Sequence, residues 1–209
     1  MSAVQHGSGP PAPPSAWVVR FLPGCLAAGD PNGEPVRRQM LDVACGGGRH
    51  LRYGLGLGLA VTGVDRDLGG VADLAAHPDV TLIAADLEAE NRKSLAGLLT
   101  GRRFAAVVVT NYLWRPLLAD LVAAVADDGL FVYETFALGQ HRFGRPSNPD
   151  FLLKPNELLD VVRPSLTVIA YEHGQLEDHD RTRIVQRIAA CGPDHPWALT
   201  GCVGVPLSV

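Results

Sequence analysis

The chain has 209 residues, of which 47% are hydrophobic, and a formal net charge of −4 at pH 7. This length is ordinary for one domain with a large core, and the acidic balance argues against a broad basic surface for nucleic acid. Charges or glycines interrupt every apolar run before it reaches the length that a bilayer requires, so no membrane span is expected.

The first 15 residues are rich in Gly, Pro, Ser and Ala, with a proline cluster at residues 10–14. Such a cluster supports neither a helix nor a sheet, so residues 1–15 are predicted to be a disordered tail and residues 16–209 a single domain. A short helix is predicted within residues 16–28, near the mouth of a binding site.

The subcellular setting is predicted from the N-terminus and the cysteines. No basic segment followed by an apolar one indicates secretion. The chain's 4 cysteines, Cys25, Cys45, Cys191 and Cys202, have neither metal-ligand nor disulfide spacing, so we expect no metal site. Free thiols are typical of a reducing compartment, and a cytoplasmic location is expected.

Apolar runs alternate with helical patterns along the rest of the chain. Strands are predicted at residues 36–44, 59–64, 80–85, 104–109 and 130–133, and helices at 49–57, 68–76, 91–99, 116–125 and 154–162, with Asn91 as an N-cap. Two further strands, 166–171 and 182–191, are joined by a short charged link, which is typical of antiparallel neighbours. The pattern predicts an α/β fold with helices on both faces of a mainly parallel sheet.

The stretch from Leu41 to His50 organises this fold. It begins as a strand, turns on the consecutive glycines Gly46, Gly47 and Gly48, and then opens a helix. Glycine lets the backbone take positive φ and lie against a ligand, and such turns are where α/β proteins bind nucleotides. The alternative is an ordinary strand-to-helix turn that needs glycine only for its geometry.

Three acids fall where the strands end or turn. Asp42 lies inside the glycine stretch, Asp65 ends the second predicted strand and Asp86 the third. The carboxyl ends of parallel strands form the ligand edge of an open sheet, where an acid can bind ribose hydroxyls. Each acid alone is more often a helix cap or a solvated turn residue, whereas three acids at strand ends favour a binding role.

Two other nucleotide-binding interpretations fit less well. A nicotinamide-binding turn has the pattern G-x-G-x-x-G, and its third glycine falls on Leu51. Asp42 would repel a pyrophosphate but suits a ligand that bears an ammonium or a sulfonium. A phosphate-binding P-loop is excluded because no Gly-Lys-Ser/Thr follows the turn.

The stretches Asp42-x-Ala44-Cys45-Gly46-x-Gly48, Val64-Asp65-Arg66-Asp67 and Ala85-Asp86-Leu87 together resemble the class I S-adenosylmethionine-dependent methyltransferases. The resemblance is closest to the compact tellurite-resistance and thiopurine-like branch and covers residues 36–191. It implies a Rossmann-like, doubly wound sheet of seven strands, mostly parallel with an antiparallel last strand, in a three-layer sandwich.

The resemblance also implies a role for each residue of these motifs. Asp42 and the turn would surround the methionine end of the cofactor, Asp65 would hold the ribose, Asp86 and Leu87 would meet the adenine, and Asn111 and Tyr112 would lie below the methyl group. Ala44 stands where many members carry a glycine. Alanine is tolerated at this position if the φ of Ala44 is negative. The predicted cofactor-binding set is Asp42, Ala44, Cys45, Gly46, Gly47, Gly48, Arg49, Asp65, Arg66, Asp86, Leu87, Asn111 and Tyr112.

The implied reaction is direct displacement of a methyl group from sulfonium, in which the protein aligns the reacting atoms and supplies fixed dipoles. A general base is needed only if the nucleophile carries a proton. Tyr112, Glu134, His141 and Arg142 are the candidates. The structural alternatives are packing for Tyr112, a core position for Glu134 and solvated loop positions for His141 and Arg142. His50 is expected to orient the turn, and Cys45 to act only through its backbone.

A segment rich in proline and asparagine at residues 145–158 is predicted to be a loop on the substrate side that enters a helix. Its alternative is a capped helix with a proline-stiffened entry. The sequence as a whole favours a methyltransferase that uses S-adenosylmethionine on a small molecule rather than on nucleic acid, and it leaves the oligomeric state open. The alternatives are a non-catalytic cofactor-binding interaction or sensor module and a NAD-dependent oxidoreductase.

Overall fold

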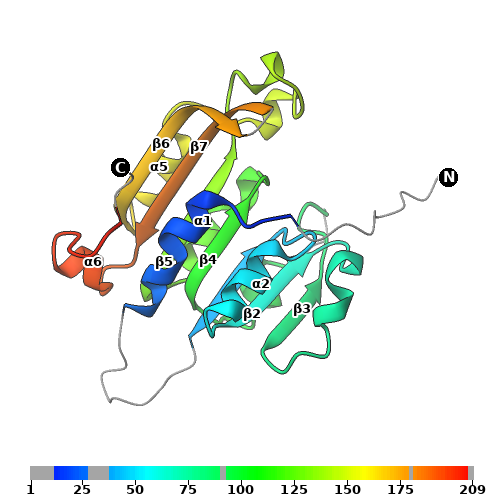
Figure 1. Cartoon of the computed structure of the whole chain (residues 1–209), viewed down its shortest axis with the longest axis vertical. Helices are drawn as coiled ribbons and strands as arrows, with labels where there is room; N and C mark the ends of the chain where they lie inside the picture. Colours follow the sequence, from blue (N-terminus) through cyan, green and yellow to red (C-terminus); the bar gives the residue numbers. More distant parts are fainter. Residues whose placement is uncertain (1–11, 28–37, 90–92, 179–180, 207–209) are drawn as a thin grey trace.

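The computed structural model describes residues 12–27, 38–89, 93–178 and 181–206. One sheet of seven strands has the order β3-β2-β1-β4-β5-β7-β6 (Figure 1). The strands β1 to β5 pair in parallel, and β7 runs antiparallel to both β5 and β6. This arrangement confirms the predicted fold class. The strands are β1 (Gln39–Val43), β2 (Ala60–Asp65), β3 (Val80–Ala84), β4 (Phe104–Thr110), β5 (Val125–Phe136), β6 (Thr167–Asp178) and β7 (Arg181–Cys191).

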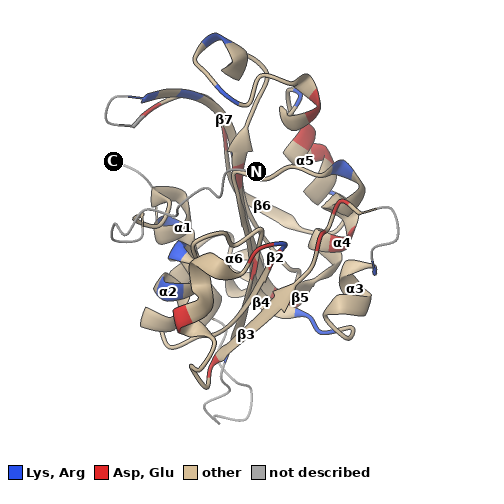
Figure 2. Ribbon diagram, turned by 90° about the vertical axis from the view of Figure 1, so that its right-hand side faces the viewer, with Lys and Arg blue, Asp and Glu red and all other residues tan. Residues whose placement is uncertain are grey.

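Short helices cover both faces of the sheet, which Figure 2 shows edge-on between its two helical layers. One face carries α1 (Ala16–Phe21), α2 (Arg49–Gly56), α6 (Pro196–Leu199) and the 3-10 helices η1 (Leu22–Leu26) and η2 (Gly69–Leu74). The other carries α3 (Leu95–Leu98), η3 (Arg115–Leu117), α4 (Leu118–Ala123) and α5 (Glu157–Val162), while η4 (Gln140–Arg142) and η5 (Pro149–Phe151) lie in the loops after β5.

Alternation along the strands divides the apolar side chains between two cores. In β1, Met40 packs on the side of α1 and α2, whereas Leu41 and Val43 pack on the side of α4 and α5. Every residue of β4 is buried, as expected for a central strand covered on both faces. The order of the strands reverses between β1 and β4, and the carboxyl edge at this point is where open α/β sheets bind ligands.

The predicted charged link at residues 172–181 is wrong. The strands β6 and β7 continue through it, and their pairing extends to Asp178 opposite Arg181. Residues 172–181 are almost all polar, with Leu176 the one aliphatic side chain, so they gave no apolar run that would mark a strand. The predicted antiparallel pairing itself is correct.

Three other predicted boundaries differ from the structure. The second helix is the 3-10 helix η2, which begins with two glycines, and Gly70 packs closely against Gly47. The strand predicted at residues 130–133 is longer at both ends, because β5 spans Val125–Phe136, with a register shift in its pairing with β4. The predicted cap Asn91 is outside the described residues, and Ser94 caps α3 by accepting a hydrogen bond from the Gly97 amide.

Arg115 fixes the segment at residues 145–158. Its guanidinium donates to the carbonyl oxygens of Asp150 and Leu152 and forms an ion pair with Glu157, with an Nε to Oε1 distance of 2.7 Å. Glu157 also accepts a hydrogen bond from the Lys154 amide, so α5 begins at Glu157 rather than at residue 154.

Within the described residues, no helix combines the length and apolar character needed to cross a bilayer.

Candidate active site

The glycine turn between β1 and α2 presents bare backbone to solvent. A Cβ at Gly48 would lie 2.4 Å from Cγ1 of Val71, so only glycine fits between the turn and η2, and its φ of 72° also favours glycine. A Cβ at Gly46 or Gly47 would instead meet no atom within 4 Å. Gly48 therefore serves packing, whereas Gly46 and Gly47 leave room beside the turn.

Ala44 departs from the expectation that its φ would be negative. Its φ is 57°, in the left-handed region, which costs an L-residue other than glycine roughly 1–2 kcal/mol. The amino acid type gave no sign of this conformation, because alanine, unlike glycine, disfavours positive φ. The turn therefore holds strain at the position where the related motif carries glycine.

Replacing Ala44 with glycine is expected to raise the free energy of unfolding by about 1 kcal/mol, because relief of the left-handed strain exceeds the added entropy of the unfolded chain. Urea unfolding measures the change. Ala60→Gly at the start of β2 is the matched control and is expected to lower stability by roughly 0.5–1 kcal/mol. Equal losses for the two variants would contradict a left-handed Ala44.

Asp65 braces the turn from the end of β2. Its Oδ2 accepts a hydrogen bond of 2.8 Å from the Gly46 amide, and its Oδ1 accepts one from the Asp67 amide. The neighbouring strand thereby fixes the position of the turn. Carboxylate oxygens have several lone pairs, so Asp65 can still accept bonds from a ligand.

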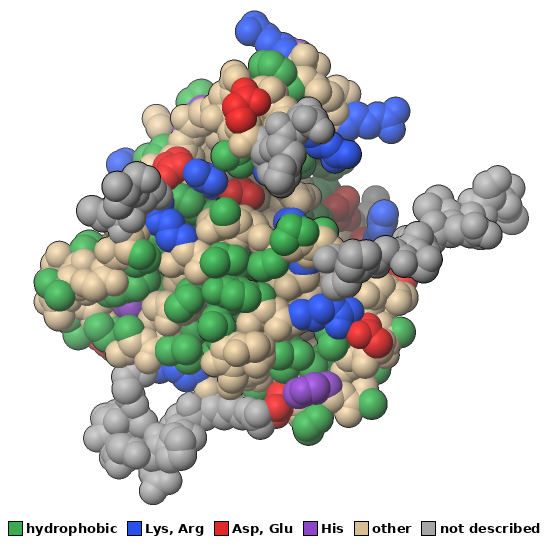
Figure 3. All heavy atoms as spheres, in the orientation of Figure 1, with side chains coloured by type: hydrophobic (Ala, Val, Ile, Leu, Met, Phe, Trp, Pro, Cys, Tyr) green, Lys and Arg blue, Asp and Glu red, His purple; other side chains and the backbone are tan. Residues whose placement is uncertain are grey.

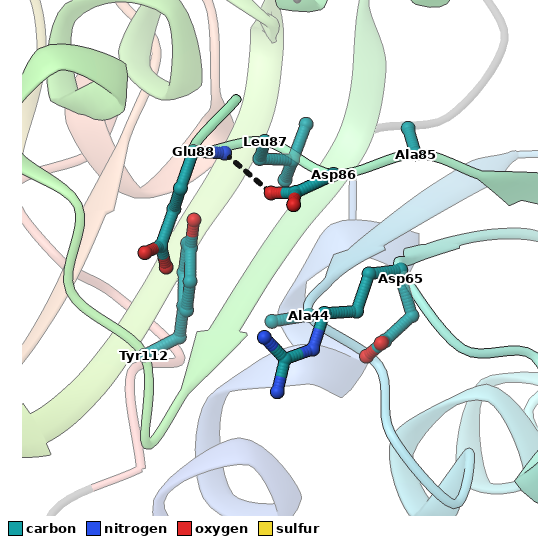
Figure 4. A pocket seen from close by; sticks show the side chains of 8 residues that line it. Ala44, Asp65, Ala85, Asp86, Leu87, Glu88 and Tyr112 are labelled. Carbon is teal, nitrogen blue, oxygen red and sulfur yellow. Dashed lines mark hydrogen bonds between the residues drawn. The ribbon is translucent and has the colours of Figure 1, made fainter. Parts of the chain in front are cut away.

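A cavity of about 290 Å³ lies on one side of Ala44, at the ends of β2 and β3 (Figure 4). It brings together the predicted residues Asp65, Arg66, Asp86, Leu87 and Tyr112. The sequence analysis missed Glu88, which also lines it and whose amide donates to Asp86 Oδ1. Its position two residues after Asp86 was the available signal. Figure 4 shows the Glu88 side chain alongside the Tyr112 ring.

A second cavity, of about 270 Å³, lies on the other side of Ala44. The glycine turn, the start of α2 and the end of β4 form its walls; its lining includes Cys45, Gly46, Gly47, Arg49, His50, Thr110 and Asn111. Thr110 is a further residue that the sequence analysis missed, and its Oγ1 accepts a hydrogen bond from Arg49. Both cavities include Ala44, so together they follow the carboxyl edge past the turn.

Asp42 lies beneath the turn, with only 1% of its surface exposed. Its Oδ2 atom has no hydrogen-bond partner among the described residues, and His50 Nδ1 lies 3.9 Å away. Burial raises the pKa of the carboxyl group to about 8; Arg49 opposes this shift and Asp65 adds to it. An unpartnered buried carboxylate oxygen is costly, and a nearby positive charge would reduce that cost.

His50, which was expected to orient the turn, lies near the start of α2 beside Asp42. It is buried, and its Nε2 accepts the backbone amide of Ser15 at 3.1 Å. In the neutral ring Nδ1 then carries the proton and faces Asp42. Burial lowers the pKa of His50 to about 3, with Arg49 as the second cause, so the ring stays neutral near pH 7.

Glu134 joins a chain of polar contacts at the end of β5. Its Oε1 accepts the Ser15 hydroxyl at 3.2 Å, and its Oε2 lies 3.4 Å from Nη1 of Arg187. Arg187 also pairs with Glu172. Neither Ser15 nor Arg187 was predicted, because β7 pairing and the fold of the N-terminal segment bring them to Glu134 from distant parts of the chain.

The prediction of a disordered tail over residues 1–15 does not hold at its end. Residues 1–11 are outside the described part, but residues 12–15 line the cavities. Ser15 caps α1, and Arg49 donates to the Pro13 carbonyl oxygen. A proline-rich segment can lie against other residues without backbone hydrogen bonds to a neighbouring strand. The Arg49 and Ser15 side chains hold this segment in place.

Two of the candidate bases lie apart from this group. His141 and Arg142 are exposed in η4 and line neither cavity beside Ala44. Cys45 is buried, and burial raises the pKa of its thiol to about 12, so it is no nucleophile near pH 7. Among the described residues, no three His, Cys, Asp or Glu side chains gather as metal ligands.

Comparison with solved structures finds the same fold in several methyltransferases. TehB from Haemophilus influenzae superimposes with a TM-score of 0.57 and 18% identity, over 76% of this chain but only 58% of that chain. The N-methyltransferase NodS from Bradyrhizobium japonicum WM9 gives 0.56 and 15%, over 83% of this chain and 93% of that chain.

The 1,6-didemethyltoxoflavin-N1-methyltransferase of Burkholderia thailandensis, solved with 1,6-didemethyltoxoflavin and S-adenosylhomocysteine, gives a TM-score of 0.53 and 19% identity over 82% of this chain and 77% of that chain. Comparison with protein-family models and with curated protein sequences finds no match. At these identities the likeness establishes a shared fold: the chain has the Rossmann-like α/β fold of these solved proteins.

Proposed function

We propose that the chain is an S-adenosylmethionine-dependent methyltransferase that acts on a small-molecule acceptor. The observation that carries the proposal is the pair of cavities that meet at Ala44. One is lined by the acids that end β2 and β3, and the other by bare glycine backbone and Arg49. A nucleoside with a charged amino-acid tail matches this division.

The predicted cofactor residues follow the same division. We assign Asp65 to the ribose hydroxyls, Asp86 and Leu87 to the adenine, and the turn from Ala44 to Gly48 to the methionine end. Asn111 and Tyr112 follow β4 and are assigned to the side of the methyl group. Asp42 supports a positively charged ligand because its buried Oδ2 lacks a partner among the described residues. Bare backbone at Gly46 and Gly47 allows close approach.

S-adenosylmethionine, when bound, supplies a methyl group on a positively charged sulfur. The chain's own part is to align the acceptor and keep water out of the reaction. For an acceptor that carries a proton, Glu134 is the proposed proton acceptor, because Arg187 and Ser15 hold its carboxylate at the end of β5. Tyr112 is proposed as a wall of the site, and no role is proposed for His141.

Calorimetric titration with S-adenosylmethionine and S-adenosylhomocysteine tests the proposal. We expect both to bind, whereas no binding of either at high micromolar concentration would contradict it. Titration with NADH by fluorescence serves as the contrast, and tight binding there would favour an oxidoreductase. Binding of S-adenosylmethionine without formation of S-adenosylhomocysteine on any nucleophile panel would favour a non-catalytic module.

The acidic net charge supports a small molecule over nucleic acid as substrate. A cytoplasmic location stays a prediction from the free thiols and the N-terminal sequence.

A further inference from the structure

A larger cavity, of about 600 Å³, opens beside the glycine turn. Its walls are the N-terminal segment at residues 12–16, Glu134, and the ribbon formed by the ends of β6 and β7. Ala12 and Arg49 line both this cavity and the one at the glycine turn, so the two spaces adjoin. Figure 3 shows this side of the molecule hollowed, with Lys and Arg side chains on its borders.

The described lining of this cavity is positively charged, although the chain as a whole is acidic. Four guanidinium groups, from Arg49, Arg181, Arg183 and Arg187, face two carboxylates, from Glu134 and Glu177. Arg187 is balanced by its ion pairs with Glu134 and Glu172. Among the described residues, Arg49 donates to two neutral oxygens, those of Pro13 and Thr110, and these contacts leave its charge uncompensated.

The arginines of β7 share one face of the strand. Arg181, Arg183 and Arg187 are separated by even numbers of residues, so their side chains leave the strand on the same side. Among the described residues, Arg181 forms no ion pair. Glu177, the second lining carboxylate, accepts a hydrogen bond of 2.9 Å from the Thr182 hydroxyl.

Arg181 and Arg183 also line a neighbouring cavity of about 540 Å³. Phe136, Phe143 and Arg145 complete its wall together with Gln140. Arg145 comes from the segment at residues 145–158, which Arg115 fixes to the body of the protein. The side chains of Arg181 and Arg183 thus stand between two hollows, within reach of a ligand in either.

We propose that the methyl acceptor carries an anionic group, a carboxylate or a phosphate, which Arg181 and Arg183 bind while its nucleophile lies at the Glu134 end of the cavity. The inference rests on the proposed function. A guanidinium binds both anions with paired, charge-assisted hydrogen bonds, and the lining favours an anion over a neutral or cationic ligand.

The pairing of β5 and β7 also bounds the size of the acceptor. Glu134 lies opposite Arg187, and Arg183 is four residues earlier in β7. At about 3.3 Å per residue, the two positions are on the order of 13 Å apart along the strand. The acceptor is therefore an elongated molecule with its anionic group at the end remote from the nucleophile.

Two titrations test the anion subsite in the full chain saturated with S-adenosylhomocysteine. Inorganic pyrophosphate and malonate, at constant ionic strength, stand for the phosphate and carboxylate forms. We expect at least one to bind, and Arg181→Gln and Arg183→Gln each to weaken it about tenfold, the usual effect of losing a charge-assisted hydrogen bond. Glu177→Gln is expected to strengthen it, because a lining carboxylate is removed.

Arg163→Gln is the matched control, since Arg163 is exposed at the end of α5 on the other helical layer. It should change neither titration, and all four variants should bind S-adenosylhomocysteine as the unaltered chain does. The chemistry is then tested with amines, phenols and thiols offered as acid, as phosphate ester and as neutral amide. The charged forms are expected to give S-adenosylhomocysteine faster, with the loss in Arg181→Gln appearing in KM.

Equal anion binding by the unaltered chain and both arginine variants, with S-adenosylhomocysteine still bound, would overturn the subsite and leave the proposed function standing. Preference for the neutral amides would overturn it as well. Failure of the unaltered chain to bind S-adenosylhomocysteine would contradict the methyltransferase proposal, and the subsite with it.

Discussion

Valine in place of Gly47 is expected to weaken the binding of S-adenosylhomocysteine about 100-fold, and alanine about tenfold, because side-chain atoms then occupy the space in which the ligand would lie. The structure indicates that these substitutions change ligand affinity without disturbing the fold. A Cβ at Gly47 meets no protein atom within 4 Å, and the residue lacks the positive φ of Gly46 and Gly48. Calorimetry measures the affinity.

The melting temperature of the ligand-free protein should therefore hardly change in the Gly47 variants. Gly56→Ala in α2 is the matched control, since a Cβ there is equally free of contacts but lies away from both cavities. It should leave affinity unchanged and raise stability slightly. Full affinity in Gly47→Val would mean that no ligand lies against the turn.

The affinity for S-adenosylmethionine is expected to rise about tenfold between pH 6 and pH 8, because Asp42 ionises over this range and only its charged form attracts a cation. The pKa of Asp42 is about 8 because of its burial. His50, whose pKa is about 3, stays neutral throughout. Calorimetry across this pH range measures the slope.

Two comparisons isolate the contribution of Asp42. The variant Asp42→Asn should flatten the dependence, and 5′-methylthioadenosine, which carries no positive charge, should show little of it with either protein. A steep slope that survives in Asp42→Asn would assign the titration to another group.

Stability should move in the opposite direction with pH. The carboxyl of Asp42 has a pKa near 3.8 when unfolded and about 8 when folded, so between these values the folded state binds more protons. Stability therefore falls as pH rises through this window. The variant Asp42→Asn should lose this part of the slope, as urea unfolding at several pH values would measure.

The sequence predicted the parts of the site that depend on local pattern. Asp65, Asp86 and Leu87 each follow an apolar strand, and parallel strands bring such ends to one edge, where the structure has them. The positive φ of Ala44 was not predictable in this way, because its amino acid type favours the opposite.

The missed residues depend on long-range pairing. Arg187 meets Glu134 only through the antiparallel register of β5 and β7, and no local motif marks either the pairing or its register. Ser15 was assigned to a tail on composition alone, although a single serine after a proline cluster can cap a helix. The ribbon at residues 172–181 was missed because its strands lack a continuous apolar run.

The position of Ser15 has a practical consequence. Its amide donates to His50, which lines the cavity at the glycine turn, and its hydroxyl donates to Glu134, which lines the adjoining cavity. A single residue therefore contacts both proposed binding sites. Trimming the protein to Ala16, where α1 begins, would remove both contacts while sparing every strand and helix that the structure describes. We expect such a shortened protein to keep its fold, with the loss of the α1 cap, and to bind both of its ligands differently from the full chain.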